Sequence, residues 1–294
     1  MTKIIDIQPA VLVTGVSSGI GLAIAEDLLH KGYRVFGSVR RAEDTESLEA
    51  RWGKSFTSLV FDVTDKTTLE NAVSLVESEL DGQNLAALIN NAGVSFAGPL
   101  IHQPLDEIRQ TFEVNVFGVL TVTRAFLPLL GARSGAVGSP GRIVNISSVS
   151  GAITVPFLAA YSASKHAVEA FTQGLRRELK PYGIEVSAIE PGFIRSQLFE
   201  KSALAKPFER YTETDYVELW QQFNKSMLEQ ESKAKLPTVV TQAVRHAIQA
   251  KKPRTRYPLD GIWYVGKILP DRVFDQLIFR ALGITKLISN RFGR

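Results

Sequence analysis

Tyr161 and Lys165 stand four residues apart at the start of a segment, residues 162–180, whose apolar pattern predicts a helix. Side chains four residues apart share one face of a helix. A phenol with an ordinary pKa of about 10 is a poor base at neutral pH, but an adjacent ammonium favours the phenolate and lowers that pKa. The pair therefore predicts a side chain that gives or takes a proton during catalysis. The alternative is a packed tyrosine beside a surface lysine.

The segment Thr14–Gly21 has the composition of a phosphate-binding turn. It follows a short apolar run and precedes a helical pattern. Glycines allow a tight turn and a close backbone approach, and the N–H groups at the start of the helix attract a pyrophosphate. The order strand, turn, helix predicts a dinucleotide site, although a simple Gly/Ser-rich turn is the alternative. The predicted contacts are Gly15, Ser17, Ser18, Gly19, Ile20 and Gly21.

The end of the second predicted strand indicates which dinucleotide is bound. An acidic residue about 20 positions after the glycines would bind the ribose 2′-hydroxyl of NAD. Val39 stands near that position instead, and Arg40 and Arg41 follow it. A guanidinium suits a 2′-phosphate in both charge and geometry. We therefore predict NADP(H) rather than NAD(H); the alternative is that both arginines pair with the acidic residues of a solvated turn.

Short apolar runs alternate with helical patterns along the chain, which predicts an α/β Rossmann fold. We expect one doubly wound parallel sheet of about seven strands with helices on both faces. After the third strand, Asp62 and Val63 could contact the adenine, or Asp62 could cap the next turn. Strands are expected at 11–13, 34–39, 58–61, 85–89, 142–146, 184–189 and, at the edge, 257–258; helices are expected at 20–30, 47–52, 67–80, 105–130 and 162–180.

The domain organisation follows from this pattern. We expect a catalytic nucleotide-binding domain over residues 1–256, in which 196–231 forms a substrate lid rich in aromatic residues. Those aromatic residues could cover an apolar ligand, pack as core or form a subunit contact. Residues 257–294 are expected to form an amphipathic helical extension.

Several motifs occur together in one order: Thr14–Gly21, Asn90–Gly93, Asn115, Ser148, Tyr161–Lys165 and Pro191-Gly192. This set resembles the short-chain dehydrogenase/reductase family over roughly residues 8–200. The stretch 161–192 is similar to the steroid and retinol dehydrogenase branch of that family. The resemblance implies an oxidoreductase that transfers a hydride between the nicotinamide cofactor and a carbonyl/alcohol pair.

The resemblance also implies a role for each residue. Ser148, favoured over Ser147 by its spacing, would hydrogen-bond the reacting oxygen. Lys165 would bind the nicotinamide ribose. Asn115 would hold a water that links Lys165 to solvent, or would simply be a buried polar group satisfied by backbone. Further cofactor contacts are Asn91, Ala92, Gly93, Pro191, Gly192, Ile194 and Ser196, which replaces the usual threonine.

Residues around the expected reacting oxygen are mostly apolar, which suits a lipophilic ketone, aldehyde or alcohol. The predicted substrate contacts are Ser95, Phe96, Ser148, Phe157, Tyr161 and Phe193. Two other functions stay open: a catalytically silent nucleotide-binding sensor or scaffold, and an NAD-preferring dehydrogenase of the same fold.

Composition excludes several other classes of site. The 294 residues include no cysteine, so disulfides and thiolate metal sites are excluded. Four histidines without a close acidic cluster predict no metal. A net charge of +4 is too small to indicate nucleic-acid binding. No signal peptide or membrane-spanning segment is predicted, so we expect a cytoplasmic protein.

The charge is unevenly distributed along the chain. From Lys233 onward there are thirteen basic and three acidic residues, a net charge of +10, so the first 232 residues carry −6. The amphipathic pattern over 262–282 could lie on a membrane interface, cover the substrate pocket or contact a partner subunit. We expect a homodimer or homotetramer, with a possible peripheral membrane contact through this C-terminal segment.

Overall fold

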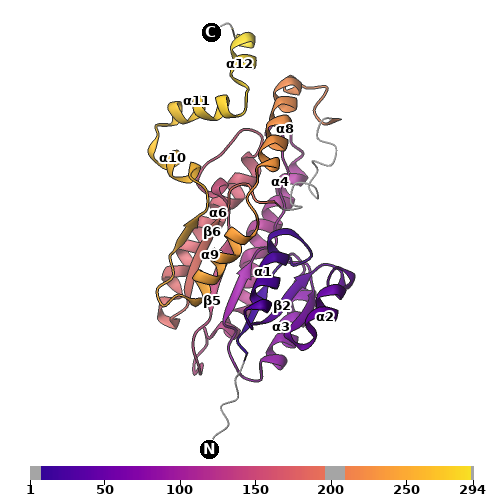
Figure 1. Cartoon of the computed structure of the whole chain (residues 1–294), viewed down its shortest axis with the longest axis vertical. Helices are drawn as coiled ribbons and strands as arrows, with labels where there is room; N and C mark the ends of the chain where they lie inside the picture. Colours follow the sequence, from indigo (N-terminus) through magenta and orange to yellow (C-terminus); the bar gives the residue numbers. More distant parts are fainter. Residues whose placement is uncertain (1–7, 196–208, 293–294) are drawn as a thin grey trace, which may run out of the picture.

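The structure is a computed structural model, and it describes residues 8–195 and 209–292 (Figure 1). Its strands are β1 (Ala10–Val13), β2 (Arg34–Val39), β3 (Phe56–Val60), β4 (Ala87–Asn90), β5 (Arg142–Ile146), β6 (Glu185–Glu190) and β7 (Arg256–Pro258). Its helices are α1 (Gly19–His30), α2 (Glu46–Trp52), α3 (Lys66–Leu80), α4 (Leu105–Phe112), α5 (Val119–Phe126), α6 (Ala159–Glu178), α8 (Val217–Ser232), α9 (Thr238–Gln249), α10 (Ile262–Ile268), α11 (Asp271–Ala281) and α12 (Thr285–Phe292).

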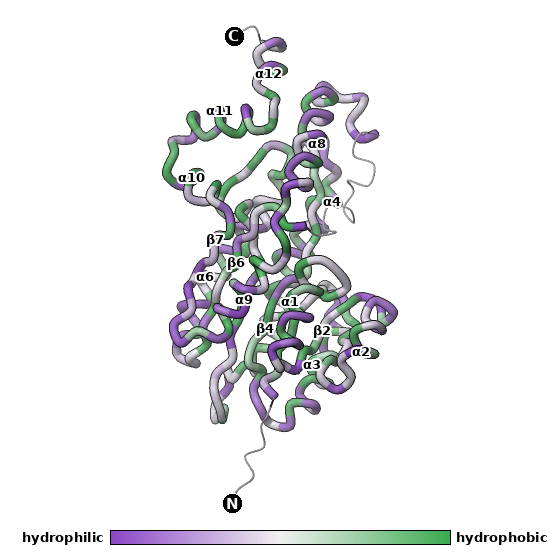
Figure 2. The backbone as a smooth tube through the Cα atoms, in the orientation of Figure 1, coloured by the Kyte–Doolittle hydropathy of each residue, from purple (hydrophilic) through white to green (hydrophobic). Residues whose placement is uncertain are grey.

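The seven strands form one parallel sheet in the order β3-β2-β1-β4-β5-β6-β7. Side chains alternate between the two faces of each strand. In β1, Val11 and Val13 pack with α1 and α9, whereas Leu12 packs with α3 and α5 on the other face. Both faces are covered, which explains why the strands read as continuous apolar runs (Figure 2). The predicted doubly wound parallel sheet is confirmed.

The sequence predicts one helix over 105–130 that Pro128 kinks or ends in its last turns; the structure confirms the effect of Pro128 but also interrupts the helix in its middle. A π-helical turn, Glu113–Gly118, separates α4 from α5, and a short 3-10 turn, Pro128–Leu130, follows. Pro128 has no N–H to continue the α-helical hydrogen bonding, so α5 ends at Phe126. π-helical turns are rare and often occur at functional sites. The apolar spacing predicted helical backbone here but carried no signal for the extra residue in the turn.

The predicted edge strand at Tyr257-Pro258 is confirmed as part of the last strand of the sheet. β7 pairs with β6 from Arg256 to Pro258. The helices of the C-terminal extension therefore begin beyond Pro258. The expected helix over 162–180 also starts earlier, at Ala159, which places Tyr161 inside α6.

A third apolar cluster joins α8 to the C-terminal helices. Trp220 and Phe223 are fully buried in it, with ring centroids 5.7 and 5.1 Å from that of Phe157. Ile278 of α11 is buried in the same cluster. Of the lid predicted over 196–231, residues 196–208 lie outside the described part of the chain. Within the described part, Trp220 and Phe223 pack as core rather than over a ligand.

A buried ionic cluster ties α10 to the sheet. The Arg256 guanidinium lies 2.6 Å from a Glu169 carboxylate oxygen and 2.7 Å from Glu190 Oε1. Trp263 of α10 donates a hydrogen bond to the same Glu190 oxygen at 2.6 Å. Two buried carboxyl groups thus share one guanidinium. Burial, together with the charge of Glu190, raises the pKa of Glu169 to about 7, although Arg256 and Lys267 oppose the shift. One carboxyl group of the pair therefore holds a proton near neutral pH.

This proton makes stability depend on pH in a defined direction. The pKa of Glu169 is raised on folding, so its stabilising contribution is complete below the ordinary pKa near 4.5 and is lost as pH rises through about 7. We expect the free energy of unfolding of the wild type, relative to Glu169→Gln, to fall by up to about 3 kcal/mol between about pH 5 and about pH 8. Urea unfolding followed by circular dichroism measures this difference.

The matched control is Glu178→Gln, which changes an exposed glutamate on the same helix. Its stability curve should run parallel to that of the wild type. The same parallel behaviour in Glu169→Gln would show that the buried pair holds no proton in this range.

Candidate active site

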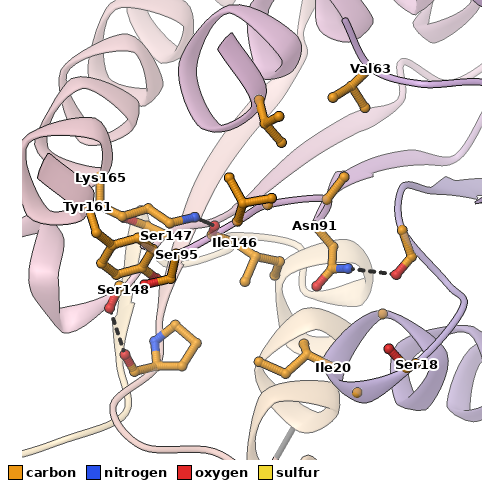
Figure 3. Close-up of a pocket in the computed structure, with 18 of the residues that line it drawn as sticks. Ser18, Ile20, Val63, Asn91, Ser95, Ile146, Ser147, Ser148, Tyr161 and Lys165 are labelled. Atoms are coloured by element: carbon orange, nitrogen blue, oxygen red, sulfur yellow. Dashed lines mark hydrogen bonds between the residues drawn. The ribbon is translucent and has the colours of Figure 1, made fainter. Parts of the chain in front are cut away.

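A cavity of about 660 Å³ opens at the carboxyl ends of the strands, where loops after β1, β4, β5 and β6 converge. Most residues predicted to contact cofactor or substrate line it (Figure 3). They are Gly15, Ser17, Ser18, Gly19, Ile20, Gly21, Arg40, Asp62, Val63, Asn91, Ala92, Gly93, Ser95, Phe96, Ser148, Tyr161, Lys165, Pro191, Gly192, Phe193 and Ile194. Ser196 lies outside the described residues.

Glycine is required in the loop after β1 for two different reasons. Gly15 and Gly19 adopt φ values of +72° and +60°, a region that other residues rarely enter. Gly21 has an ordinary backbone, but a Cβ there would overlap Gly15 O and Asn91 Nδ2. The Asn91 amide donates to Thr14 O at 2.9 Å and to Gly15 O at 3.1 Å, so β4 braces this loop (Figure 3). The start of α1 is thereby held against the cavity.

Tyr161, Ser148 and Lys165 are buried side by side at the cavity wall (Figure 3). Tyr161 and Lys165 share the inward face of α6, as predicted from their spacing. The Lys165 ammonium lies 5.7 Å from the centre of the Tyr161 ring and donates to Ile146 O at 2.9 Å. The Ser148 hydroxyl hydrogen-bonds Tyr161, whereas the neighbouring Ser147 faces Glu169. The geometry thus separates the two serines that the sequence left adjacent.

Burial decides the protonation of this group. It raises the pKa of Tyr161 to about 12, and the hydrogen bond with Ser148 opposes the shift only in part. The sequence predicted a lowered pKa from two positive charges, the adjacent ammonium and an oxidised nicotinamide ring; the ammonium alone does not offset burial. Burial also lowers the pKa of Lys165 to about 8, although the charge of Glu169 acts the other way. In the structure Tyr161 is therefore a neutral phenol near neutral pH, which suits it to donate a proton.

Asn115 lies in the π-helical turn and is completely buried. Its side-chain oxygen accepts a hydrogen bond from Val94 N at 2.8 Å, and its amide donates to Val94 O at 2.8 Å and to Ser164 Oγ at 3.1 Å. These bonds correspond to the alternative in which Asn115 is satisfied by backbone. The side chain fixes the loop after β4 against α6 at Val94, the residue directly before Ser95.

The two adjacent arginines after β2 have different surroundings. Arg40 lines the cavity beside the glycine loop. Arg41 does not line it: its guanidinium pairs with Asp44 at 2.8 Å, and this pairing raises the pKa of Arg41. The structure thus places Arg40 at the cavity and Arg41 in the exposed turn, so of the two predicted arginines only Arg40 faces the cofactor cavity. Asp62 lines the cavity and also caps its own turn, accepting from Thr64 N at 2.9 Å.

Phe157, predicted to contact substrate, is not among the residues that line the cavity. Its φ is +68°, and its ring packs against Tyr216, Trp220 and Phe223 in the third apolar cluster. The backbone turns the side chain away from the site, which its position in the sequence did not reveal. Phe157 supports the wall through its carbonyl, which accepts a hydrogen bond from Gly98 N at 2.8 Å.

Several lining residues were missed by the sequence analysis. Gln110, Glu113 and Val114 reach the cavity from α4 and the π-helical turn. Their spacing of three and four residues was the available signal, because it places them on one side of the helix that carries Asn115. The sequence also gave no indication of Ser38, which lines the cavity. Its carbonyl oxygen accepts a hydrogen bond from Gly15 N at 3.1 Å.

A chain of buried amides lies beneath the site. Asn90 donates to Asn145 Oδ1 at 2.9 Å, and Asn145 donates to Thr172 Oγ1 at 2.8 Å. These bonds link β4, β5 and α6, the three elements that carry the polar groups of the cavity. In the described ranges, no helix is long and apolar enough to cross a bilayer, and no three His, Asp or Glu side chains gather as a metal site would require.

Comparison with known proteins places the chain among relatives. The family model for short chain dehydrogenases matches residues 9–206. The chain is 42% identical to the NADPH-dependent 3-dehydrocapnine reductase of Ornithobacterium rhinotracheale, covering 92% of this chain and 96% of that protein. It is 30% identical to mouse retinol dehydrogenase 5, covering 91% of this chain and 87% of that protein.

A solved structure extends the likeness to three dimensions. The crystal structure of a short-chain dehydrogenase from Streptomyces avermitilis superposes with a TM-score of 0.74 at 30% identity, covering 97% of this chain and 98% of that one. The chain belongs to the short-chain dehydrogenase family and is an oxidoreductase.

Proposed function

We propose that this oxidoreductase uses NADP(H) to interconvert a lipophilic ketone or aldehyde and its alcohol, with Tyr161 as the general acid or base. The observation that carries the proposal is the group formed by Tyr161, Ser148 and Lys165, buried in the cavity that the glycine loop also lines. The proton donor, Tyr161, and the glycine loop after β1 therefore line the same cavity.

The residues present fit NADP(H). A Cβ at Gly15 would lie 3.0 Å from Ala92 Cα, so glycine is needed where the loop packs closely on the segment after β4. This loop leads into α1, whose first N–H groups would meet a pyrophosphate. Arg40 lines the cavity at the end of β2, where NAD-binding folds carry an acid. Its guanidinium would pair with the 2′-phosphate. The 42% sequence identity to an NADPH-dependent reductase also supports NADP(H) as the cofactor.

The side chains then have defined tasks. Reduced nicotinamide, when bound, supplies the hydride to the carbonyl carbon. Tyr161 gives its hydroxyl proton to the carbonyl oxygen, and Ser148 donates a hydrogen bond to that oxygen. Lys165 stabilises the phenolate that remains, because its ammonium lies over the same ring. A Tyr161 pKa of about 12 keeps the phenol protonated near neutral pH, which is the form that donates a proton in the reductive direction.

The lining around this group indicates a lipophilic substrate. Val94, Phe96, Leu158 and Phe193 are apolar, and Ser95, Ser148 and Ser150 add hydroxyl groups to the lining. The charged side chains that line the cavity are Arg40, Asp62, Glu113 and Lys165. Such a surface favours a neutral, apolar molecule that is oriented by a few hydrogen bonds.

Loss of the Tyr161 hydroxyl tests the proton-transfer step. We expect Tyr161→Phe to lower kcat for reduction of a lipophilic ketone by about 10²–10⁴-fold, because the oxygen then gains no positioned proton. NADPH binding, measured by fluorescence titration, should change little. The control is Tyr182→Phe, at an exposed tyrosine beyond the end of α6. Wild-type turnover in Tyr161→Phe would contradict the proposal.

The paired arginines give a sharp test of the cofactor. Arg40→Ala should raise the KM for NADPH by about 10–100-fold, since a charge-assisted hydrogen bond contributes about 1.5–3 kcal/mol. The KM for NADH should stay nearly constant. Arg41→Ala, the adjacent control, should leave both values unchanged because Asp44 already holds that side chain. Equal effects on NADPH and NADH would rule out a 2′-phosphate contact at Arg40.

A homologous series of ketones tests the substrate class. Each methylene buried on an apolar wall contributes about 0.8 kcal/mol, so kcat/KM for NADPH-dependent reduction should rise about four-fold per added methylene until the cavity is filled. NADPH absorbance follows the reaction. A ketone bearing a carboxylate at the chain end serves as control and should react poorly. A flat series would contradict a lipophilic substrate.

A further inference from the structure

The turn between α10 and α11 exposes large apolar side chains to solvent. Ile268 is 78% exposed, Val273 50% and Leu277 39%, and Pro270 separates the first from the other two. The inward side of α11 is already used, because Ile278 is buried in the third apolar cluster. α11 therefore has one apolar side packed on the protein and a second exposed to solvent.

Basic residues share this outward side. At about 100° per residue, Leu277 and Arg280 lie within about 40° of Val273 on the helical wheel, and Arg272 lies about 100° away. Arg272 and Arg280 are exposed. Asp271 and Asp275 lie about 160° from Val273, on the far side of the helix. The face thus combines apolar and cationic side chains and keeps the acidic residues of α11 away from it.

The remaining positive charge of the C-terminal part does not belong to this face. Arg256 forms ion pairs with Glu169 and Glu190 inside the fold. The carbonyl of Arg254 accepts a hydrogen bond from Ser187, which places the preceding basic run beside β6. The basic residues that give the C-terminal part its net charge of +10 therefore lie in several separate regions. Only Arg272 and Arg280 belong to the exposed surface of α11.

We propose that the outward face of α10 and α11, formed by Ile268, Val273 and Leu277 with Arg272 and Arg280, docks on an anionic lipid surface. An interfacial helix inserts apolar side chains while its cations meet lipid phosphates. A second copy of the same face would bring like charges together, so charge complementarity favours lipid over self-association. β7 runs parallel to the other strands, so α10 follows the sheet edge where the cavity also lies (Figure 1).

Vesicle co-sedimentation tests this face independently of turnover. The full chain is mixed with phosphatidylcholine vesicles containing about 30 mol % phosphatidylglycerol, or none, in about 0.05 M or about 0.5 M salt. We expect binding to the anionic vesicles at low salt, with much less binding at high salt or to neutral vesicles. Arg272→Gln and Arg280→Gln should each lower the partition coefficient about five-fold.

The apolar contribution is tested by the double variant Val273→Asp/Leu277→Asp, which should lower vesicle binding at least ten-fold. Its control, Leu75→Asp/Val137→Asp, makes the same charge change at two exposed apolar positions elsewhere and should bind as the wild type does. Thermal unfolding and reduction of a water-soluble ketone, equal in all variants, show that the fold is intact. Reduced turnover with unchanged vesicle binding would count against the proposed function and would leave the proposed lipid contact standing.

Three results would overturn the proposal. The first is no binding of the wild type to anionic vesicles at low salt. The second is equal binding by the double variant and its control. The third is a combined result: the wild type does not bind vesicles, and Val273→Asp/Leu277→Asp changes the oligomeric state measured by sedimentation velocity. That result would show that the face contacts a second copy of the chain.

Discussion

The parallel direction of all seven strands is the constraint on which the site depends, because it brings every carboxyl end to one edge of the sheet. Gly15 and Asn91 are 76 residues apart in sequence, yet they hydrogen-bond at that edge. Ser148 follows β5 at the same edge and meets Tyr161 there. The apolar clusters on the two faces hold the strand register. The cavity is thus positioned by the core rather than by contacts within the cavity itself.

Burial then sets the chemistry of the polar groups that the sheet brings together. It raises the pKa of Tyr161 and of Glu169 and lowers that of Lys165, so in each case the uncharged form is favoured. The ammonium of Lys165 also donates a hydrogen bond to the carbonyl oxygen of Ile146. The phenol keeps its proton, but a raised pKa makes it a weaker acid, so proton donation needs positive charge beside the ring to stabilise the phenolate that forms. This balance is a property of the buried pair and not of either residue.

The C-terminal segment is joined to this machinery through Arg256. Its guanidinium satisfies one carboxylate from α6 and one from β6, and Trp263 brings α10 onto the same Glu190 oxygen. Removing a guanidinium from two buried carboxylates leaves uncompensated charge in the interior, which costs several kcal/mol. The helical extension is therefore anchored by a buried charge beside the helix that carries Tyr161, while its outward face is left for contacts of another kind.

The sequence by itself determined the alternation of strands and helices, the parallel sheet, the glycine loop and the Tyr161–Lys165 pair, because local periodicity and spacing carry those features. Tertiary structure alone decided that Arg40 lines the cavity while Arg41 pairs with Asp44. It agrees with the spacing in placing Ser148, rather than Ser147, beside Tyr161. It also decided that Phe157 is core. The physical reason is that pKa, pairing and exposure depend on atoms brought from distant strands, and periodicity along one segment contains no information about those atoms.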